Sequence, residues 1–152
     1  MKIPDYSLLL RQLESILSIE TDPVANMANT AALLFNQLDQ INWAGFYVRR
    51  GHELVLGPFQ GKPACVRIAW GKGVCGTAAK TGKILRVENV HQFAGHIACD
   101  SASKSEIVVP IFTEGKVWGV LDIDSPVLNR FDWHDQTFLE KVVALFVEKT
   151  AL

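Results

Sequence analysis

The cysteine at position 99 has the most distinctive surroundings of any potentially reactive residue in this chain of 152 residues. Cys99 lies within GHIACDSASKSEIVVPI, residues 95–111, beside Asp100 and several small polar residues, and a hydrophobic strand follows. A cysteine that only fills a core is usually flanked by apolar residues, whereas loops on a rigid scaffold often carry catalytic groups. A basic neighbour would favour the thiolate. His96 and Lys104 are the nearest candidates, and Asp100 opposes them.

Two aspartates with the same orientation follow Cys99 along the chain. Asp122 and Asp124 lie in GVLDIDS, residues 119–125, and side chains two positions apart in a strand point to the same face. Most such acids are solvated surface residues, but the apolar run around these two makes an acid costly unless it has partners. Together with Cys99 they favour redox or nucleophilic cysteine chemistry that is assisted by a proton donor.

The chain has three cysteines, Cys65, Cys75 and Cys99, and no recognisable secretory signal. An odd number in that context argues against a structural disulfide framework. The spacings between them are long, with no C-x2-C knuckle, so we expect no metal site. Cys75, in GVCGTAAKTG, fits best the interpretation as a small buried hydrophobic residue. Cys99 fits the interpretation as a buried hydrophobic residue least well.

Composition limits the range of functions. The formal net charge is −1 and 49% of the residues are hydrophobic, with no basic cluster of the kind that binds nucleic acid or a membrane surface. No apolar stretch approaches the length of a transmembrane helix, and the start of the chain does not resemble a signal peptide. We therefore expect a cytoplasmic protein, and 152 residues are enough for one domain with a sizeable core.

Hydrophobic periodicity predicts the elements that must position these residues. Helical spacing occupies the two ends of the chain, and Asp22-Pro23 has the composition of a helix start. The predicted helices are residues 6–17, 23–39, 74–80 and 132–151. The predicted strands are residues 43–48, 54–57, 64–68, 84–87, 107–112 and 116–124, with loops at 57–63 and 88–103.

This order of elements predicts an α+β fold. The strands should form one antiparallel sheet, with the N- and C-terminal helices packed on one face. The loops should close over the other face and create a pocket. The connection at residues 88–103 is long for a compact domain, and such loops are usually functional.

Several motifs together resemble one known family, the free methionine-(R)-sulfoxide reductases, which are stand-alone enzymes with the GAF fold. The resemblance rests on NWAGFY (42–47), GPFQGKPACVRI (57–68), GKGVCGTA (71–78), GHIACDSASKSEIVVPI (95–111) and VLDIDS (120–125). It covers about residues 42–131, and the flanking helices fit it in length and position. It implies a single GAF-like domain for residues 1–152.

The resemblance also implies roles for the cysteines. Cys99 would attack the sulfur of free L-methionine (R)-sulfoxide, release methionine and become a sulfenic acid. Cys65 would resolve the sulfenic acid as a disulfide, and thioredoxin would reduce that disulfide. Cys75 matches a third cysteine whose role is secondary. This chemistry requires no metal, flavin or nicotinamide cofactor.

The same resemblance places Glu106, Asp122 and Asp124 in an acidic pocket. A thiolate that attacks a sulfoxide cannot expel the oxygen as an oxide ion, so that oxygen must be protonated. Clustered carboxyls resist simultaneous ionisation, so one of them can hold a proton near neutral pH. We assign Glu106 and Asp124 to catalysis and Asp122 to substrate binding, although the residues themselves leave open which acid donates.

Trp43 and Tyr47 match the aromatic wall of the family's pocket, and ordinary sheet core is the alternative. They share a strand face with Gly45 between them, which would leave a gap for the methyl group of a thioether.

A different class of function is also compatible with the sequence, namely a non-catalytic GAF-type module that binds a small ligand. Such a module would not need the Cys65/Cys99 pair together with three acids. A reductase for peptide-bound methionine sulfoxide is a weaker alternative, because the loop at 88–103 favours a closed pocket. The sequence does not determine the oligomeric state, and a homodimer through the terminal helices is compatible with the resemblance.

Overall fold

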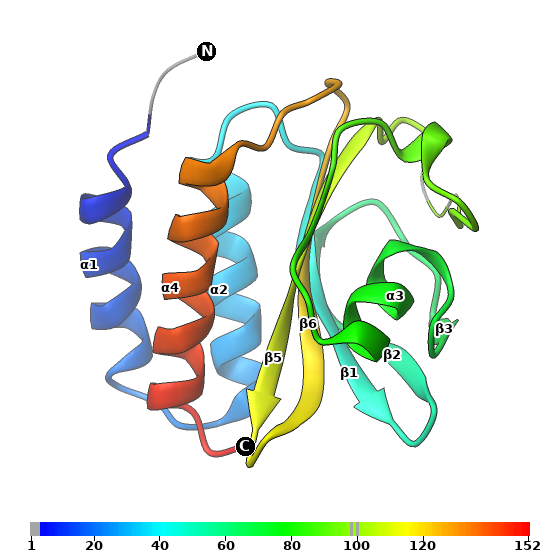
Figure 1. Cartoon of the computed structure of the whole chain (residues 1–152). Coiled ribbons are helices and arrows are strands. Elements are labelled where there is room, and N and C mark those ends of the chain that lie inside the picture. The colour runs from blue at the N-terminus through cyan, green and yellow to red at the C-terminus, as the bar shows by residue number, and fades with distance from the viewer. Residues whose placement is uncertain (1–3, 98, 100) are drawn as a thin grey trace.

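A six-stranded antiparallel sheet forms the centre of the molecule, in the strand order β3-β2-β1-β6-β5-β4. The computed structural model describes residues 4–97, 99 and 101–152, so the expectation for Asp100 lies outside the described residues. Helices α1, α2 and α4 cover one face of the sheet, while α3 and the long loop lie over the other (Figure 1). The predicted α+β architecture is confirmed.

The four helices begin and end close to the predicted positions. Asp22 caps α2 by accepting a hydrogen bond from the backbone of Ala25, and Pro23 occupies the first turn, where its missing N–H costs nothing. Asp132 and Asp135 form a capping box at the start of α4. No helix among the described residues is both long and apolar enough to cross a membrane. The bounds are α1 Tyr6–Leu17, α2 Pro23–Gln37, α3 Gly73–Thr81 and α4 Trp133–Lys149.

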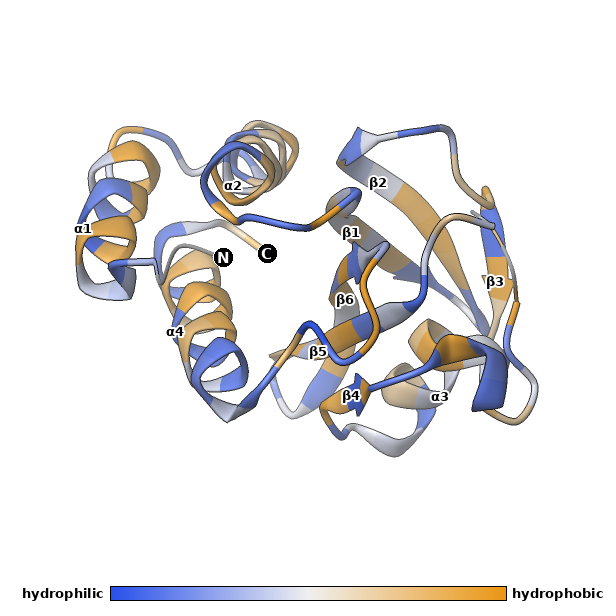
Figure 2. Ribbon diagram, turned by 90° about the horizontal axis from the view of Figure 1, so that it is seen from above, coloured by the Kyte–Doolittle hydropathy of each residue, from blue (hydrophilic) through white to orange (hydrophobic). Residues whose placement is uncertain are grey.

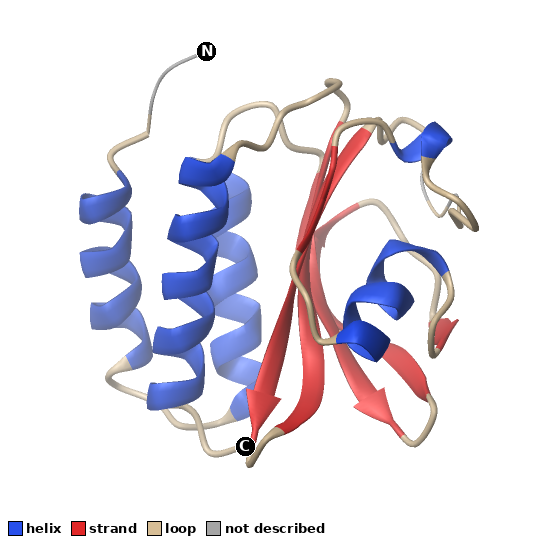
Figure 3. Ribbon diagram, viewed as in Figure 1, coloured by secondary structure: helices blue, strands red, loops and turns tan. Residues whose placement is uncertain are grey.

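The strands differ from prediction mainly in β2 and β3. Figure 3 shows the strands as a layer between the long helices and the short helix. β2 continues through the predicted loop to Gly61, because a bulge in its pairing with β1 accommodates Gly57 and Pro58. β3 begins only at Arg67, three residues later than predicted. The bounds are β1 Trp43–Arg50, β2 Glu53–Gly61, β3 Arg67–Ala69, β4 Leu85–Val87, β5 Ser105–Thr113 and β6 Lys116–Ser125.

Hydrophobic clusters lie on both faces of the sheet, which separates the three long helices from α3 (Figure 2). On the helical face, Phe46 of β1 packs against Phe146 of α4, with ring centroids 5.1 Å apart. A buried ion pair of 3.2 Å between Arg130 and Asp135 fixes the start of α4, and Tyr6 of α1 donates a hydrogen bond to Asp135. This face gives the strands a rigid support for the site on the opposite face.

Candidate active site

Strand register brings the predicted acids and aromatics together. Glu106 of β5 lies opposite Asp124 of β6, which in turn lies opposite Trp43 of β1. Residues directly opposite each other on neighbouring strands point to the same face. Asp122 lies in the adjacent row, two residues from Asp124 on the same face. The three acids therefore converge on the face that α3 and the long loop cover.

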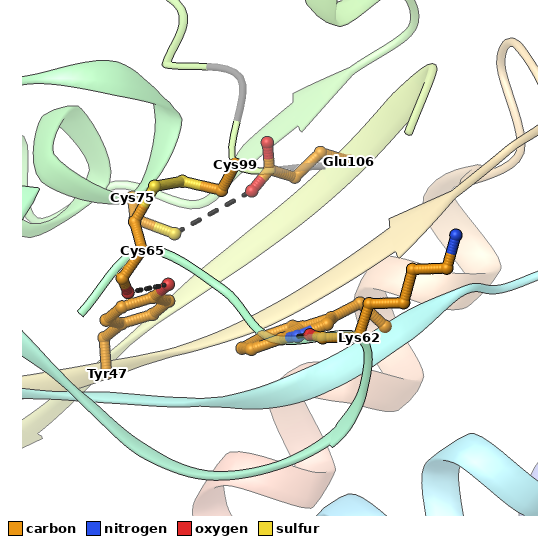
Figure 4. The surroundings of a disulfide bond; sticks show 7 residues. Tyr47, Lys62, Cys65, Cys75, Cys99 and Glu106 are labelled. Carbon is orange, nitrogen blue, oxygen red and sulfur yellow. Dashed lines mark hydrogen bonds between the residues drawn. A yellow bond between two sulfur atoms is a disulfide. The ribbon is translucent and has the colours of Figure 1, made fainter. Parts of the chain in front are cut away.

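A disulfide joins Cys65, in the segment before β3, to Cys99, in the loop that follows the short 3-10 helix η1 (Val90–Gln92). The Cα atoms are 5.4 Å apart although 34 residues separate them in sequence. Both cysteines are half-buried, and Figure 4 shows the bond next to the side chains of Cys75 and Glu106. The pairing that the family resemblance implies is therefore present in the structure.

Beside this disulfide lies a cavity of about 50 Å³, a volume that holds only a few water molecules. Seven of the eight predicted site residues line it, and the eighth, Cys65, is covalently bound to one of them. The seven are Trp43, Tyr47, Cys75, Cys99, Glu106, Asp122 and Asp124. With Cys99 held in the disulfide, the site has little free space.

The carboxyl of Asp122 is deeply buried within this group. Its side chain sits in the middle of the sheet, and the residue is only 5% exposed. Burial raises the pKa of Asp122 well above its usual range, and the charges of Asp124 and Glu106 raise it further. Its Oδ1 is buried without a hydrogen-bond partner among the described residues. Burial and the neighbouring carboxyls therefore favour the protonated form of Asp122.

Cys75, at the start of α3, is buried as predicted, but its position adds an interaction that the sequence does not reveal. Its thiol donates a hydrogen bond to Glu106 Oε2 over 3.8 Å (Figure 4). Burial raises the pKa of the Cys75 thiol, and the charges of Asp122 and Glu106 add to this effect. A thiol that stays protonated is a poor nucleophile, so Cys75 is suited to a supporting position beneath the carboxyls.

Cys75, Glu106 and Asp122 also form a candidate metal-binding group among the described residues, with potential ligand atoms within 4.8 Å of one another. Metal ligands must be deprotonated, whereas burial favours the protonated forms of both Cys75 and Asp122. A cation at this position would therefore have to displace the protons of Cys75 and Asp122.

The aromatic wall also helps to hold the disulfide segment. The Tyr47 hydroxyl donates a hydrogen bond to the carbonyl oxygen of Cys65 over 2.9 Å (Figure 4). Burial raises the pKa of Tyr47, with a contribution from the charge of Asp122, so the hydroxyl remains a donor. Trp43 Nε1 donates to the carbonyl oxygen of Lys62 over 3.2 Å. These bonds hold the Cys65 segment beside the site and account for the late start of β3.

The predicted gap over Gly45 is filled, which corrects the sequence interpretation. A Cβ atom at position 45 would lie 2.3 Å from Phe59 Cβ and 2.8 Å from the Trp43 ring. Trp43 lies between Tyr47 and Phe59, with ring centroids 5.9 Å and 5.2 Å away. Gly45 thus allows close aromatic packing instead of an open hole. Phe59 escaped the sequence analysis because its segment was interpreted as a loop.

The cationic residues of the site are only partly those expected. His96 lines the cavity, whereas Lys104 is exposed. Lys72, immediately before α3, lines the cavity as well. The positive end of the α3 dipole adds to the charge of Lys72 there. In the sequence, the glycines on either side of Lys72, Gly71 and Gly73, were the signal that could have predicted this turn.

A family comparison agrees with this geometry. Residues 12–150 match the model of the GAF domain. The chain belongs to the GAF domain family. It is 52% identical over 139 residues to the free methionine-R-sulfoxide reductase of Escherichia coli, covering 91% of this chain and 84% of that protein. It is 60% identical to Protein YtsP of Bacillus subtilis over 140 residues, covering 91% and 86%.

Solved structures show the same relationship. The structure of fRMsr of Staphylococcus aureus in complex with substrate has a TM-score of 0.95 and 51% sequence identity to this chain, covering 99% of each. The resemblance to free methionine-(R)-sulfoxide reductases that the motifs indicated is confirmed.

The protonated state of Asp122 has a measurable effect on stability. In the fold, the pKa of Asp122 lies above that of the unfolded chain. Its contribution to stability is therefore full at acidic pH and is lost as the pH rises from about 4 through the folded pKa. Asparagine has a similar shape and cannot ionise. The free energy of unfolding of Asp122→Asn, relative to wild type, should rise between about pH 5 and pH 8 in urea titrations. A constant difference would show that Asp122 ionises normally.

Proposed function

We propose that this protein reduces free L-methionine (R)-sulfoxide to methionine through cysteine chemistry. The observation that carries the proposal is the Cys65–Cys99 disulfide beside a buried group of three carboxyls, in a cavity with an aromatic wall. The similarity to proteins named free methionine-R-sulfoxide reductase supports the choice of substrate. A non-catalytic binding module would have no use for a cysteine pair at this position.

In the first step, the Cys99 thiolate attacks the sulfoxide sulfur. One acid of the three-carboxyl cluster protonates the sulfoxide oxygen. The sulfur–oxygen bond then breaks, and the hydroxyl is transferred to Cys99 Sγ. The substrate sulfur gains two electrons and leaves as the thioether of methionine, while Cys99 becomes a sulfenic acid. The Cys65 thiol then attacks this sulfenic sulfur, water leaves, and the observed disulfide forms.

The cluster of three carboxyls, Glu106, Asp122 and Asp124, supplies the proton, because the titrations of the three acids are coupled. In the resting site, Asp122 holds the proton because it is deeply buried. The ammonium group of the substrate pairs with Asp122 and favours its ionised form. Glu106 or Asp124 is then the protonated acid of the cluster and donates its proton to the sulfoxide oxygen. This division keeps Asp122 in substrate binding and the other two acids in catalysis.

The remaining parts of the substrate meet complementary groups. The S-methyl group packs against the rings of Trp43 and Tyr47, where sulfur–aromatic contacts are favourable. The α-carboxylate is directed to Lys72 and the N-terminal end of α3, which are the positive part of the cavity wall.

A protein dithiol of the thioredoxin class then reduces the disulfide and returns both cysteines to thiols. The proposal places the protein in the cytoplasm, where such reducing systems operate.

The direct test uses the separate R and S epimers of free methionine sulfoxide with a small dithiol, and follows the release of methionine. The R epimer should be consumed, and Cys99→Ser should abolish turnover while keeping the fold, because the nucleophile is lost with little change in volume. Failure of both epimers with the wild-type protein would refute the proposal. Binding without turnover would instead support the non-catalytic binding module.

The Cys65→Ser variant separates attack from resolution. It should still release about one methionine per protein molecule in a single turnover, because Cys99 is intact, and leave a sulfenic acid that dimedone traps. Sustained turnover with thioredoxin should collapse. If thioredoxin-driven turnover is normal, Cys65 does not resolve the sulfenic acid, and Cys75 becomes the candidate.

Amide variants distinguish the roles of the acids. Glu106→Gln or Asp124→Asn, whichever residue donates the proton, should slow the single-turnover step at saturating substrate by roughly 10²–10⁴-fold. Asp122→Asn should mainly raise the substrate concentration that saturates the site, because the ammonium loses an ionic partner. A large loss of rate at saturation in Asp122→Asn alone would reverse the assignment. Near-normal behaviour of all three variants would remove the acids from the mechanism.

A further inference from the structure

Two exposed apolar side chains flank the disulfide on its solvent side. Val66 follows Cys65 directly and is 63% exposed, while Ile97 precedes Cys99 by two residues and is 40% exposed. Ile97 rests on the first residue of α3, since a Cβ atom at Gly73 would lie 3.3 Å from its side chain. Single exposed apolar residues are common on protein surfaces. Here, however, one lies within two residues of each cysteine of a half-buried disulfide, and Ile97 also lines the cavity.

The backbone next to Val66 lies at the open edge of the sheet. β3 is the terminal strand in the sheet order. The carbonyl oxygen of Val66 accepts a hydrogen bond from Leu56, and the N–H of Trp70 donates to His52, so these residues face β2 and its turn. In an antiparallel ladder, residues at odd spacing from them face the other way. The N–H and C=O of Arg67 therefore point outward, where an extended segment of another protein can pair.

The two sulfurs of the disulfide have different surroundings. Cys99 lines the cavity that contains the three carboxyls. Cys65 precedes the exposed edge strand, and its carbonyl oxygen is fixed by the Tyr47 hydroxyl at 2.9 Å. A protein that approaches along β3 therefore reaches the Cys65 side of the bond, with the Cys99 side directed toward the cavity.

We propose that Val66, Ile97 and the outward backbone of Arg67 form the docking surface for a protein dithiol reductant, which attacks Sγ of Cys65. The other outward residue of β3, Ala69, already accepts a hydrogen bond from Lys72 at its carbonyl oxygen. The proposal rests on the function proposed above, since that function requires the disulfide to be reduced in each cycle. Val66 and Ile97 supply apolar contact, and the Arg67 backbone supplies hydrogen bonds to an extended segment of the partner.

The exchange then runs in two balanced steps. A thiolate of the reductant forms a bond to Cys65 Sγ, the Cys65–Cys99 bond breaks, and Cys99 leaves as a thiolate into the cavity, where the carboxyl group can protonate it. The second thiol of the reductant displaces Cys65 from the mixed disulfide. The reductant ends as a disulfide, and both cysteines are again reduced.

The first test starts from the oxidised protein and follows its reduction by thioredoxin with thioredoxin reductase and NADPH, without any sulfoxide. Val66→Ser should lower kcat/KM for thioredoxin by roughly tenfold, because an apolar contact is lost, and leave reduction by dithiothreitol unchanged. The matched control is Val24→Ser, since Val24 of α2 is 61% exposed on the opposite face of the sheet. Equal rates with thioredoxin for Val66→Ser and Val24→Ser would overturn the docking surface.

The second test addresses the strand edge. Proline is tolerated at an edge position whose N–H points outward, so Arg67→Pro removes the donor that the partner needs. Arg67→Ala is the control, because it removes the side chain and its exposed ion pair with Glu53 but keeps the N–H. Arg67→Pro should slow reduction by thioredoxin, and Arg67→Ala should not. Equal effects of the two variants would exclude backbone pairing.

The third test identifies the sulfur that is attacked. A thioredoxin whose second active-site cysteine is replaced by serine stops at the mixed disulfide. After acid quenching, peptide mapping should find it joined to Cys65, and a bond to Cys99 would overturn the proposal. Because these assays contain no sulfoxide, a failure here is distinct from a failure of the epimer test.

Discussion

The buried carboxyl of Asp122, in the middle of β6, is the constraint on which the site depends. A charge at this depth is costly, so the fold keeps the group protonated by burial and by its acidic neighbours. Glu106 and Asp124 lie directly opposite each other on the neighbouring strands, and their charges add to this cost. In the proposed reaction, this cluster supplies the proton that the sulfoxide oxygen requires. Structural cost and proposed chemistry therefore have one physical origin.

Such a cluster needs a rigid support. One face of the sheet provides that support, and the other face carries the site. The helical face is a hydrocarbon core, strengthened by the buried Arg130–Asp135 pair. This allows the central strands to carry polar groups on the other face without losing their pairing. The dense packing of Trp43 against Tyr47 and Phe59 over Gly45 adds stiffness near the acids.

The disulfide joins the two segments that lie over this face. The Cys65 segment is held by the Tyr47 hydroxyl, and the Cys99 loop returns to the sheet through β5. With the bond closed, the cavity is small, so the oxidised form has little room for a substrate. In the proposed cycle, reduction of the disulfide is therefore linked to access to the carboxyls, and the proposed reductant approaches from the solvent side of Cys65.

The sequence by itself determined the helices, most strands, the face shared by Asp122 and Asp124, and, through its motifs, the family. These are local properties, because periodicity, capping residues such as Asp22 and short motifs depend on neighbouring residues. Only the tertiary structure decided the rest. It set the register that places Glu106 opposite Asp124, the contact of Cys75 with Glu106, and the bulge that carried β2 through Phe59. It also decided that the pKa of Asp122 is raised, because pKa depends on burial and on charges from distant parts of the chain.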